Sequence, residues 1–193
     1  MDLSNTFTVD LPVGEAWRVL TDLERVAPCL PGATLLGVED DVYQGAVKIK
    51  VGPVSAKYQG TARFVEMDHH AHRAVLRAEG KDSGGQGNAA ATITATLTTQ
   101  GTGTKVDVRT NLALSGRVAQ FGRGVIADVT GKLLSQFVQR LEAEVAGVKP
   151  QPEPLDLTAA VGGTVAKRAL PVAAAALLAL LVILLACKGK AAQ

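Results

Sequence analysis

The chain has 193 residues, a net charge of +2 and an aromatic content of 4%. This length allows one domain of about 150 residues and an additional segment. The small, evenly spread charge argues against a nucleic-acid-binding surface. Of the two cysteines, Cys29 lies in the body of the chain and Cys187 at the end of an apolar C-terminal segment, so we expect no disulfide and a reducing compartment. The first 17 residues have neither a basic start nor an apolar core, so we expect no secretion signal.

The first part of the chain alternates short strand and helix patterns. Residues 5–12 alternate in polarity and predict a strand, and residues 13–22 predict a short helix that buries Trp17. Six more strand patterns follow, joined by turns rich in glycine and acidic residues, which indicates an antiparallel meander. These strands are expected at residues 33–38, 43–51, 55–66, 73–80, 88–99 and 105–115.

A long amphipathic helix is predicted over residues 117–146. One apolar stripe repeats at three- to four-residue steps, and Gly147 and Pro150 end it. The stripe consists of Val118, Phe121, Val125, Val129, Leu133, Phe137, Leu141 and Val145. The fold class is therefore α+β, with the helix covering one face of a curved antiparallel sheet.

The inward-facing strand residues are apolar but small, including Gly60, Ala62, Ala78 and Ala95. Because protein interiors pack densely, small residues either bring the layers together or leave a space. We expect an internal apolar cavity of a few hundred Å³ for a ligand, with close approach as the alternative. The predicted lining is Val47, Ile49, Tyr58, Gly60, Ala62, Phe64, Leu76, Ala78, Ala91, Ile93, Ala95, Val108, Thr110, Leu112, Phe121, Val125 and Val129.

Catalytic chemistry is not evident in the sequence. The histidines cluster at residues 69–72 in a predicted hairpin turn, where a solvated turn is favoured over a metal site. The glycine-rich stretches lack the spacing of phosphate or dinucleotide loops, and no serine lies in a nucleophile elbow. Tyr58 and Thr110 are the only polar groups expected to face inward. We therefore expect a protein that binds a ligand without transforming it, with no catalytic residue, no metal and no covalent cofactor.

The C-terminal region predicts a membrane anchor. Residues 147–168 contain alternating prolines and a glycine pair, typical of an extended, flexible tether. Residues 169–187 carry no charge and are long enough to cross a bilayer as a helix, and residues 188–193 form a short tail. We expect a single span in the inner (cytoplasmic) membrane with the body on the cytoplasmic side. Anchor residues include Leu170, Pro171, Leu177, Leu180, Ile183 and Leu185.

Residues 1–146 resemble a known family. The stretch "FTVDLPVGEAWRVLTDLERVAPCLPGATL", followed by "YQGAVKIKVGPVSAKYQGTARF" and the long helix, is similar to the G-subunit family of carbon monoxide dehydrogenase. That family lies within the SRPBCC/START helix-grip superfamily. The resemblance implies a seven-stranded antiparallel sheet that grips the C-terminal helix around an apolar cavity.

The resemblance also implies an accessory role beside a molybdenum- and flavin-containing CO dehydrogenase. The first hypothesis is a membrane-tethered carrier that binds a respiratory quinone, menaquinone or ubiquinone, and couples the soluble enzyme to the membrane quinone pool. The second is a purely structural recruiter of CO dehydrogenase or a related molybdenum hydroxylase, or a general carrier of apolar lipids. The third, disfavoured by the lack of inner titratable groups, is an enzyme of the cyclase kind.

Overall fold

The computed structural model describes residues 1–51 and 54–147. Seven antiparallel strands form one sheet in the order β1-β7-β6-β5-β4-β3-β2. The meander predicted from the turns is therefore confirmed, and the N-terminal strand pairs with the last one to form the second edge. The strands are β1 Asp2–Val9, β2 Ala33–Glu39, β3 Val42–Val51, β4 Val54–Asp68, β5 Arg73–Asp82, β6 Asn88–Gln100 and β7 Gly103–Leu114.

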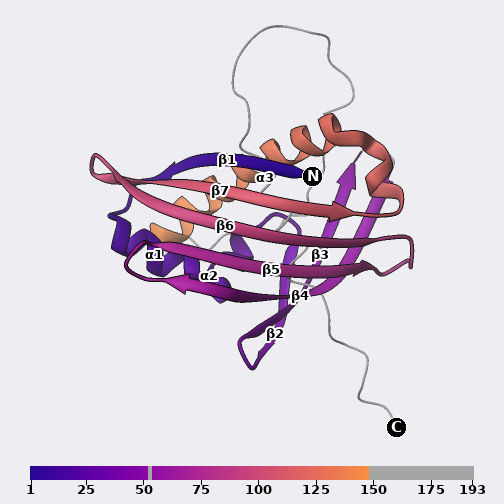
Figure 1. Ribbon diagram of the computed structural model, residues 1–193, viewed down its shortest axis with the longest axis horizontal. Helices are drawn as coiled ribbons and strands as arrows, with labels where there is room; N and C mark the ends of the chain where they lie inside the picture. The colour runs from indigo at the N-terminus through magenta and orange to yellow at the C-terminus, as the bar shows by residue number, and fades with distance from the viewer. Residues whose placement is uncertain (52–53, 148–193) are drawn as a thin grey trace, which may run out of the picture.

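Figure 1 shows the sheet curving around the C-terminal helix α3, with α1 and α2 gathered near one end of the strands. This is the helix-grip arrangement that the resemblance implied. The helical elements are α1 Val13–Thr21, α2 Leu23–Val26, the 3-10 turns η1 Ala27–Cys29 and η2 Arg117–Phe121, and α3 Gly122–Val145.

The prediction of one continuous helix over residues 117–146 is wrong at its start. Residues 117–121 form the 3-10 turn η2, and α3 begins only at Gly122. The glycines on either side of η2, Gly116 and Gly122, have φ angles of 79° and 74°, which an α-helix does not allow. These two glycines separate the turn from the helix.

The break changes which side chains of α3 face the sheet. Val125, predicted to face inward, is 40% exposed, whereas its neighbour Ile126 is 3% exposed. Phe121 lies at the end of η2 and is half-buried. From Val129 onward the predicted stripe is correct. The buried residues of α3 are Ile126, Val129, Thr130, Leu133, Leu134, Phe137 and Leu141.

The "CLPGA" segment packs near the C-terminal end of α3. Cys29 and Leu30 are fully buried, and burial raises the pKa of the Cys29 thiol to about 11. The Arg25 guanidinium (Nε) lies 3.2 Å from Glu144 Oε1 at this end of α3. Both side chains of that pair are partly exposed, so we assign it little stability. The segment is therefore structural, with a thiol held in its neutral form.

The tether, membrane span and tail predicted over residues 148–193 lie outside the described residues, as do the six anchor residues. Within residues 1–51 and 54–147, no helix is both long and apolar enough to cross a bilayer.

Candidate ligand cavity

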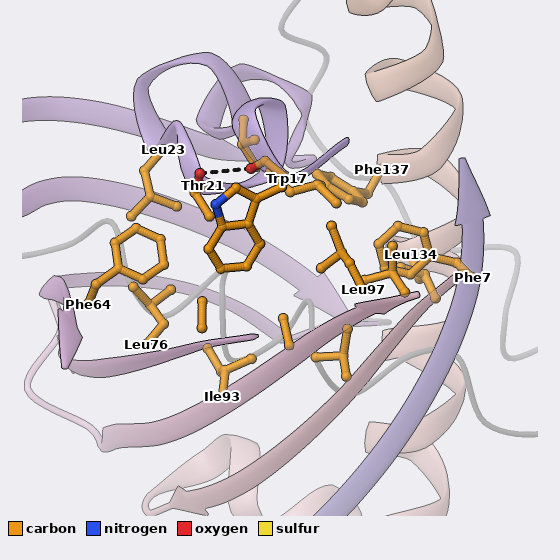
Figure 2. Close-up of a pocket in the computed structure, with 16 residues that line it drawn as sticks. Phe7, Trp17, Thr21, Leu23, Phe64, Leu76, Ile93, Leu97, Leu134 and Phe137 are labelled. Atoms are coloured by element: carbon orange, nitrogen blue, oxygen red, sulfur yellow. Dashed lines mark hydrogen bonds between the residues drawn. The ribbon is translucent and has the colours of Figure 1, made fainter. Parts of the chain in front are cut away.

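An apolar cavity lies between the sheet and the helices α1, α2 and α3. Its volume is about 70 Å³, and Figure 2 shows side chains from both layers converging on it. Thr21 is the one hydroxyl among the sixteen lining residues, and none of them is ionisable. The lining consists of Phe7, Trp17, Leu20, Thr21, Leu23, Val26, Phe64, Ala74, Leu76, Ile93, Ala95, Leu97, Val106, Val108, Leu134 and Phe137.

Strand register builds the sheet side of the cavity. Residues directly opposite each other in neighbouring strands share a face of the sheet. Leu76 of β5 stands opposite Ile93 of β6, and Ala95 of β6 stands opposite Val108 of β7. The wall therefore consists of adjacent cross-strand rows that face the helices.

Trp17 of α1 projects into the space between the layers. In Figure 2 its indole lies between Phe64 and Leu76 on one side and Leu97 and Phe137 on the other. The residue is 5% exposed. It is the chain's single tryptophan, and three of the four phenylalanines also line the cavity. The few aromatic side chains are thus concentrated at this site.

The histidine-containing turn between β4 and β5 contacts Trp17. The indole Nε1 donates a hydrogen bond of 3.0 Å to Nδ1 of His69. The rings of His69 and His72 both lie 5.6 Å from the indole, edge to face. The turn is exposed at His69 and His70, as the sequence predicted. Its packing against a cavity residue was not predicted, because no local pattern connects residue 17 with residue 69.

Asp68 organises the same turn. Its carboxylate accepts backbone hydrogen bonds of 2.9 Å from His70 and from Ala71. These bonds lower the pKa of Asp68, so the cap persists in mildly acidic solution. The turn that carries His69 is therefore held in one conformation next to α1.

The other end of the cavity is closed by an aromatic pair. The rings of Phe7, on β1, and Phe137, on α3, lie 6.0 Å apart at an interplanar angle of 86°. This edge-to-face contact connects the edge strand to the helix. The arrangement can accommodate an apolar group.

The family model of CoxG, the G subunit of carbon monoxide dehydrogenase, matches residues 6–146. The chain belongs to the CoxG family. This membership confirms the resemblance stated above and implies a ligand-binding accessory protein associated with CO dehydrogenase. No curated protein matches the chain by sequence.

Solved structures share the fold of this CoxG domain. A conserved protein from Geobacillus kaustophilus superposes with a TM-score of 0.68 at 21% identity, covering 76% of this chain and 96% of that one. TTHA0849 from Thermus thermophilus gives 0.51 at 17% identity, covering 76% and 98%. The Zhui aromatase/cyclase from Streptomyces sp. R1128 also gives 0.51, at 14% identity, covering 75% and 95%. At these identities the likeness concerns the fold alone.

Within the CoxG domain, five of the predicted lining residues meet at the cavity: Phe64, Leu76, Ile93, Ala95 and Val108. The remaining predicted positions do not line it. Ten are buried elsewhere in the core: Val47, Ile49, Tyr58, Gly60, Ala62, Ala78, Ala91, Thr110, Leu112 and Val129. Phe121 is half-buried and Val125 is exposed, for the reason given above.

Close approach, and not a cavity, explains the glycine at position 60. A Cβ atom at Gly60 would overlap the carbonyl oxygen of Glu79 and lie 2.6 Å from Cα of Gly80. Both atoms belong to the backbone of β5 and cannot move aside as a side chain would. Here the small residue allows two strands to approach closely, and Gly60 is not among the residues that line the cavity.

The largest group of missed lining residues comes from the first helices. Trp17, Leu20 and Thr21 of α1 line the cavity together with Leu23 and Val26 of α2. Their apolar spacing was visible in the sequence, but it predicted only burial. Tertiary packing decides that α1 and α2 cover the same cross-strand rows of the sheet as the C-terminal half of α3.

Two polar side chains lie buried beside the cavity. Asn5 of β1 is 3% exposed and Thr110 of β7 is 2% exposed. The amide nitrogen and oxygen of Asn5 and the hydroxyl of Thr110 have no hydrogen-bond partner. Tyr58, the other polar residue predicted to face inward, lies opposite Asp82 in a different row. Burial and the nearby Asp82 carboxylate raise the pKa of Tyr58, which keeps its phenol neutral.

No metal site is evident in the part of the chain that the structure describes. Among residues 1–51 and 54–147, no group of three or more His, Cys, Asp or Glu side chains is arranged to hold a metal ion.

Proposed function

We propose that this CoxG-family protein is a membrane-anchored carrier that binds a respiratory quinone, menaquinone or ubiquinone, in its apolar cavity. It would thereby couple the soluble CO dehydrogenase, or a related molybdenum hydroxylase, to the membrane quinone pool. The protein would serve as a binding partner and not as an enzyme. The observation that carries the proposal is an apolar cavity between the sheet and the helices whose lining has no ionisable side chain.

The lining chemistry favours an uncharged, largely apolar ligand. An ionised group in this cavity would lose its hydration without gaining a counter-charge. Aromatic rings such as those of Trp17, Phe64 and Phe137 offer flat faces and edges for a planar ring. A quinone combines a planar ring with an isoprenoid chain, and both parts suit such a surface.

The cavity must expand to receive a quinone. Its volume of about 70 Å³ is below the ~150 Å³ of an engineered cavity that binds benzene. Trp17 is the side chain whose displacement would free the most space, because its indole stands between the two walls. We propose that the ligand enters as the indole moves, with the His69 hydrogen bond broken on entry.

The proposal also includes a location for the protein at the cytoplasmic membrane. A C-terminal span over residues 169–187 in the cytoplasmic membrane would keep the carrier next to the pool of its ligand. Residues 147–168 would tether the body on the cytoplasmic side, where a soluble dehydrogenase could meet it.

The test is direct identification of the ligand. We expect the full chain, purified in mild detergent from a quinone-producing host, to release menaquinone or ubiquinone on solvent extraction, detected by mass spectrometry. Ala95→Phe, which fills the cavity, should remove most of this quinone. Thr92→Phe, on the outer face of the same strand, should retain it. Both variants keep the anchor, so quinone dissolved in the micelle contributes equally. If the wild-type chain neither carries quinone nor binds it when added, the carrier proposal is wrong.

The small cavity volume favours a second candidate, a structural recruiter that only holds the dehydrogenase at the membrane. Under this alternative the Ala95→Phe variant would still support CO-dependent respiration in cells. Under the carrier proposal, respiration would fall although the dehydrogenase remains membrane-associated.

A further inference from the structure

The concave face of the sheet carries an unpartnered polar pair where the apolar cavity ends. Asn5 stands opposite Val108, and Thr110 stands opposite Leu3, in the pairing of β1 with β7. The two residues are therefore diagonal neighbours on one face, with Cβ atoms about 7 Å apart. A single oxygen atom placed between them is within reach of both side chains.

The pair continues the rows that form the cavity wall. The row of Ala74, Ala95 and Val108 ends at Asn5, and the row of Leu76 and Ile93 continues through Thr110 to Leu3. Phe7, two residues after Asn5 on the same strand, also lines the cavity. A cavity that widens along the sheet toward β1 would thus reach Asn5 and Thr110.

The lack of partners is costly for this part of the core. A buried amide or hydroxyl without a hydrogen bond destabilises a protein by about 1–3 kcal/mol. Buried polar groups in folded proteins are almost always bonded, so three unbonded atoms at one place require an explanation. Leucine or valine at these positions would avoid the cost and suit the apolar surroundings.

We propose that Asn5 and Thr110 form the polar subsite of the cavity. They bind a carbonyl or hydroxyl oxygen attached to the ring of the apolar ligand. This inference rests on the proposed carrier function. The Asn5 amide can donate to a carbonyl and accept from a hydroxyl, and the Thr110 hydroxyl can do either. The subsite therefore accommodates a carbonyl or a phenolic hydroxyl without any change in charge, as a carrier of oxidised and reduced ligand requires.

The test compares two probes that differ only in their oxygens: 2,3-dimethyl-1,4-naphthoquinone and 2,3-dimethylnaphthalene. Quinone binding to the full chain in mild detergent is followed by quenching of the single tryptophan, Trp17. Hydrocarbon binding is measured by competition. The substituted quinone has no free ring position for addition of a thiol. Thr110→Val keeps the side-chain shape, and Thr92→Val on the exposed face is its matched control.

We expect Thr110→Val and Asn5→Leu each to weaken quinone binding about five- to tenfold, the effect of one neutral hydrogen bond. Hydrocarbon binding should change less than twofold, and the Thr110→Val melting temperature should stay equal or rise. Asn5→Ala serves as a smaller replacement if the leucine variant does not fold. A structural role would instead lower the melting temperature and weaken both probes alike.

The two possible negative outcomes distinguish failure of the polar subsite from failure of the carrier function. If the variants bind both probes as the wild type does, the polar subsite is refuted while the cavity retains its function. If neither probe binds the wild-type chain, the carrier proposal fails and the subsite fails with it.

Discussion

The concave face of the sheet has two halves that differ in the sizes of their side chains. In the closed half, defined by Gly60, Gly80, Ala62, Ala78 and Ala91, small residues stand opposite one another across β4, β5 and β6. The cavity half combines two alanines, Ala74 and Ala95, with larger residues such as Leu76 and Ile93. Aromatic rings of α1, β1 and α3 also line it. The apolar cavity lies in the cavity half, whereas a more open pocket of about 330 Å³ adjoins Gly80 and Ala89 at the end of the closed half.

The difference teaches that opposing small side chains on neighbouring strands do not by themselves create an internal apolar cavity in this fold. Glycine allows the backbones of neighbouring strands to approach until contact, as the overlap of a Cβ at Gly60 with the β5 backbone demonstrates. Bulky rings hold layers apart, and rings that meet edge to face, such as Phe7 and Phe137, leave gaps between them. The aromatic side chains are therefore the better guide to the ligand site.

The largest effect expected is on stability, from adding one methyl group to the closed half. Gly60→Ala forces a contact with β5 backbone atoms and should destabilise the fold by about 3 kcal/mol, the upper range for overpacking. The melting temperature should then fall by roughly 10 °C. Ala95→Leu adds three carbons in the cavity half and should cost about 1 kcal/mol or less. Equal losses in the two variants would remove the distinction between the halves.

An intermediate effect is expected at the rim of the cavity half. His69→Ala removes the acceptor of the Trp17 indole and should cost about 1 kcal/mol. The fluorescence of Trp17 should change at the same time, because its indole loses a polar partner. His70→Ala, at an exposed neighbouring position in the same turn, is the matched control. If the two variants have the same stability and fluorescence, the contact has no role in closing the cavity.

At neutral pH the smallest effect on stability is expected at Cys29. This residue tests whether the core near the C-terminal end of α3 is closed to solvent. The thiol is fully buried, and its pKa of about 11 instead of 9.0 reduces the thiolate fraction near neutral pH about 100-fold. In a Cys187→Ser background, alkylation of the folded protein should be slower than that of the unfolded chain by at least this factor.

The pH dependence at Cys29 has a defined sign. Above about pH 9 the unfolded chain loses the thiol proton while the folded protein keeps it, so folding stability should decrease between pH 9 and 11. Below pH 9 the residue should contribute no pH dependence. Rapid alkylation of the folded protein at pH 8 would show that Cys29 is accessible and contradict its burial.

The sequence predicted the strands well because each alternates in polarity and is bounded by turn residues. The meander, the inward faces of β4 to β7 and the position of most of α3 all follow from this local information. The start of α3 was missed because the backbone at Gly116 and Gly122 adopts positive φ angles, which composition alone does not reveal. Val125 was misplaced as a consequence.

The sequence predicted an apolar cavity of a few hundred Å³, whereas the apolar cavity between the layers has about 70 Å³ and a partly different lining. Alternation identifies residues such as Leu76 and Ile93 as inward-facing, but it does not indicate which inward-facing residues contact a covering helix. Trp17 and Phe137 are far apart in the chain, and their common position at the cavity arises only when α1 and α3 pack on the same rows. The buried Asn5 likewise reads as an ordinary polar residue until β1 pairs with β7.

The sequence by itself determined the secondary structure, the antiparallel order and the family, since these depend on short-range patterns and on motifs contiguous in the chain. The tertiary structure decided where the layers touch and where they stay apart. That outcome depends on the volumes and directions of side chains brought together from distant segments. At Gly60 two neighbouring strands are in close contact, whereas aromatic rings from four elements surround the apolar cavity. The unsatisfied polar pair of Asn5 and Thr110 lies at the border of this cavity.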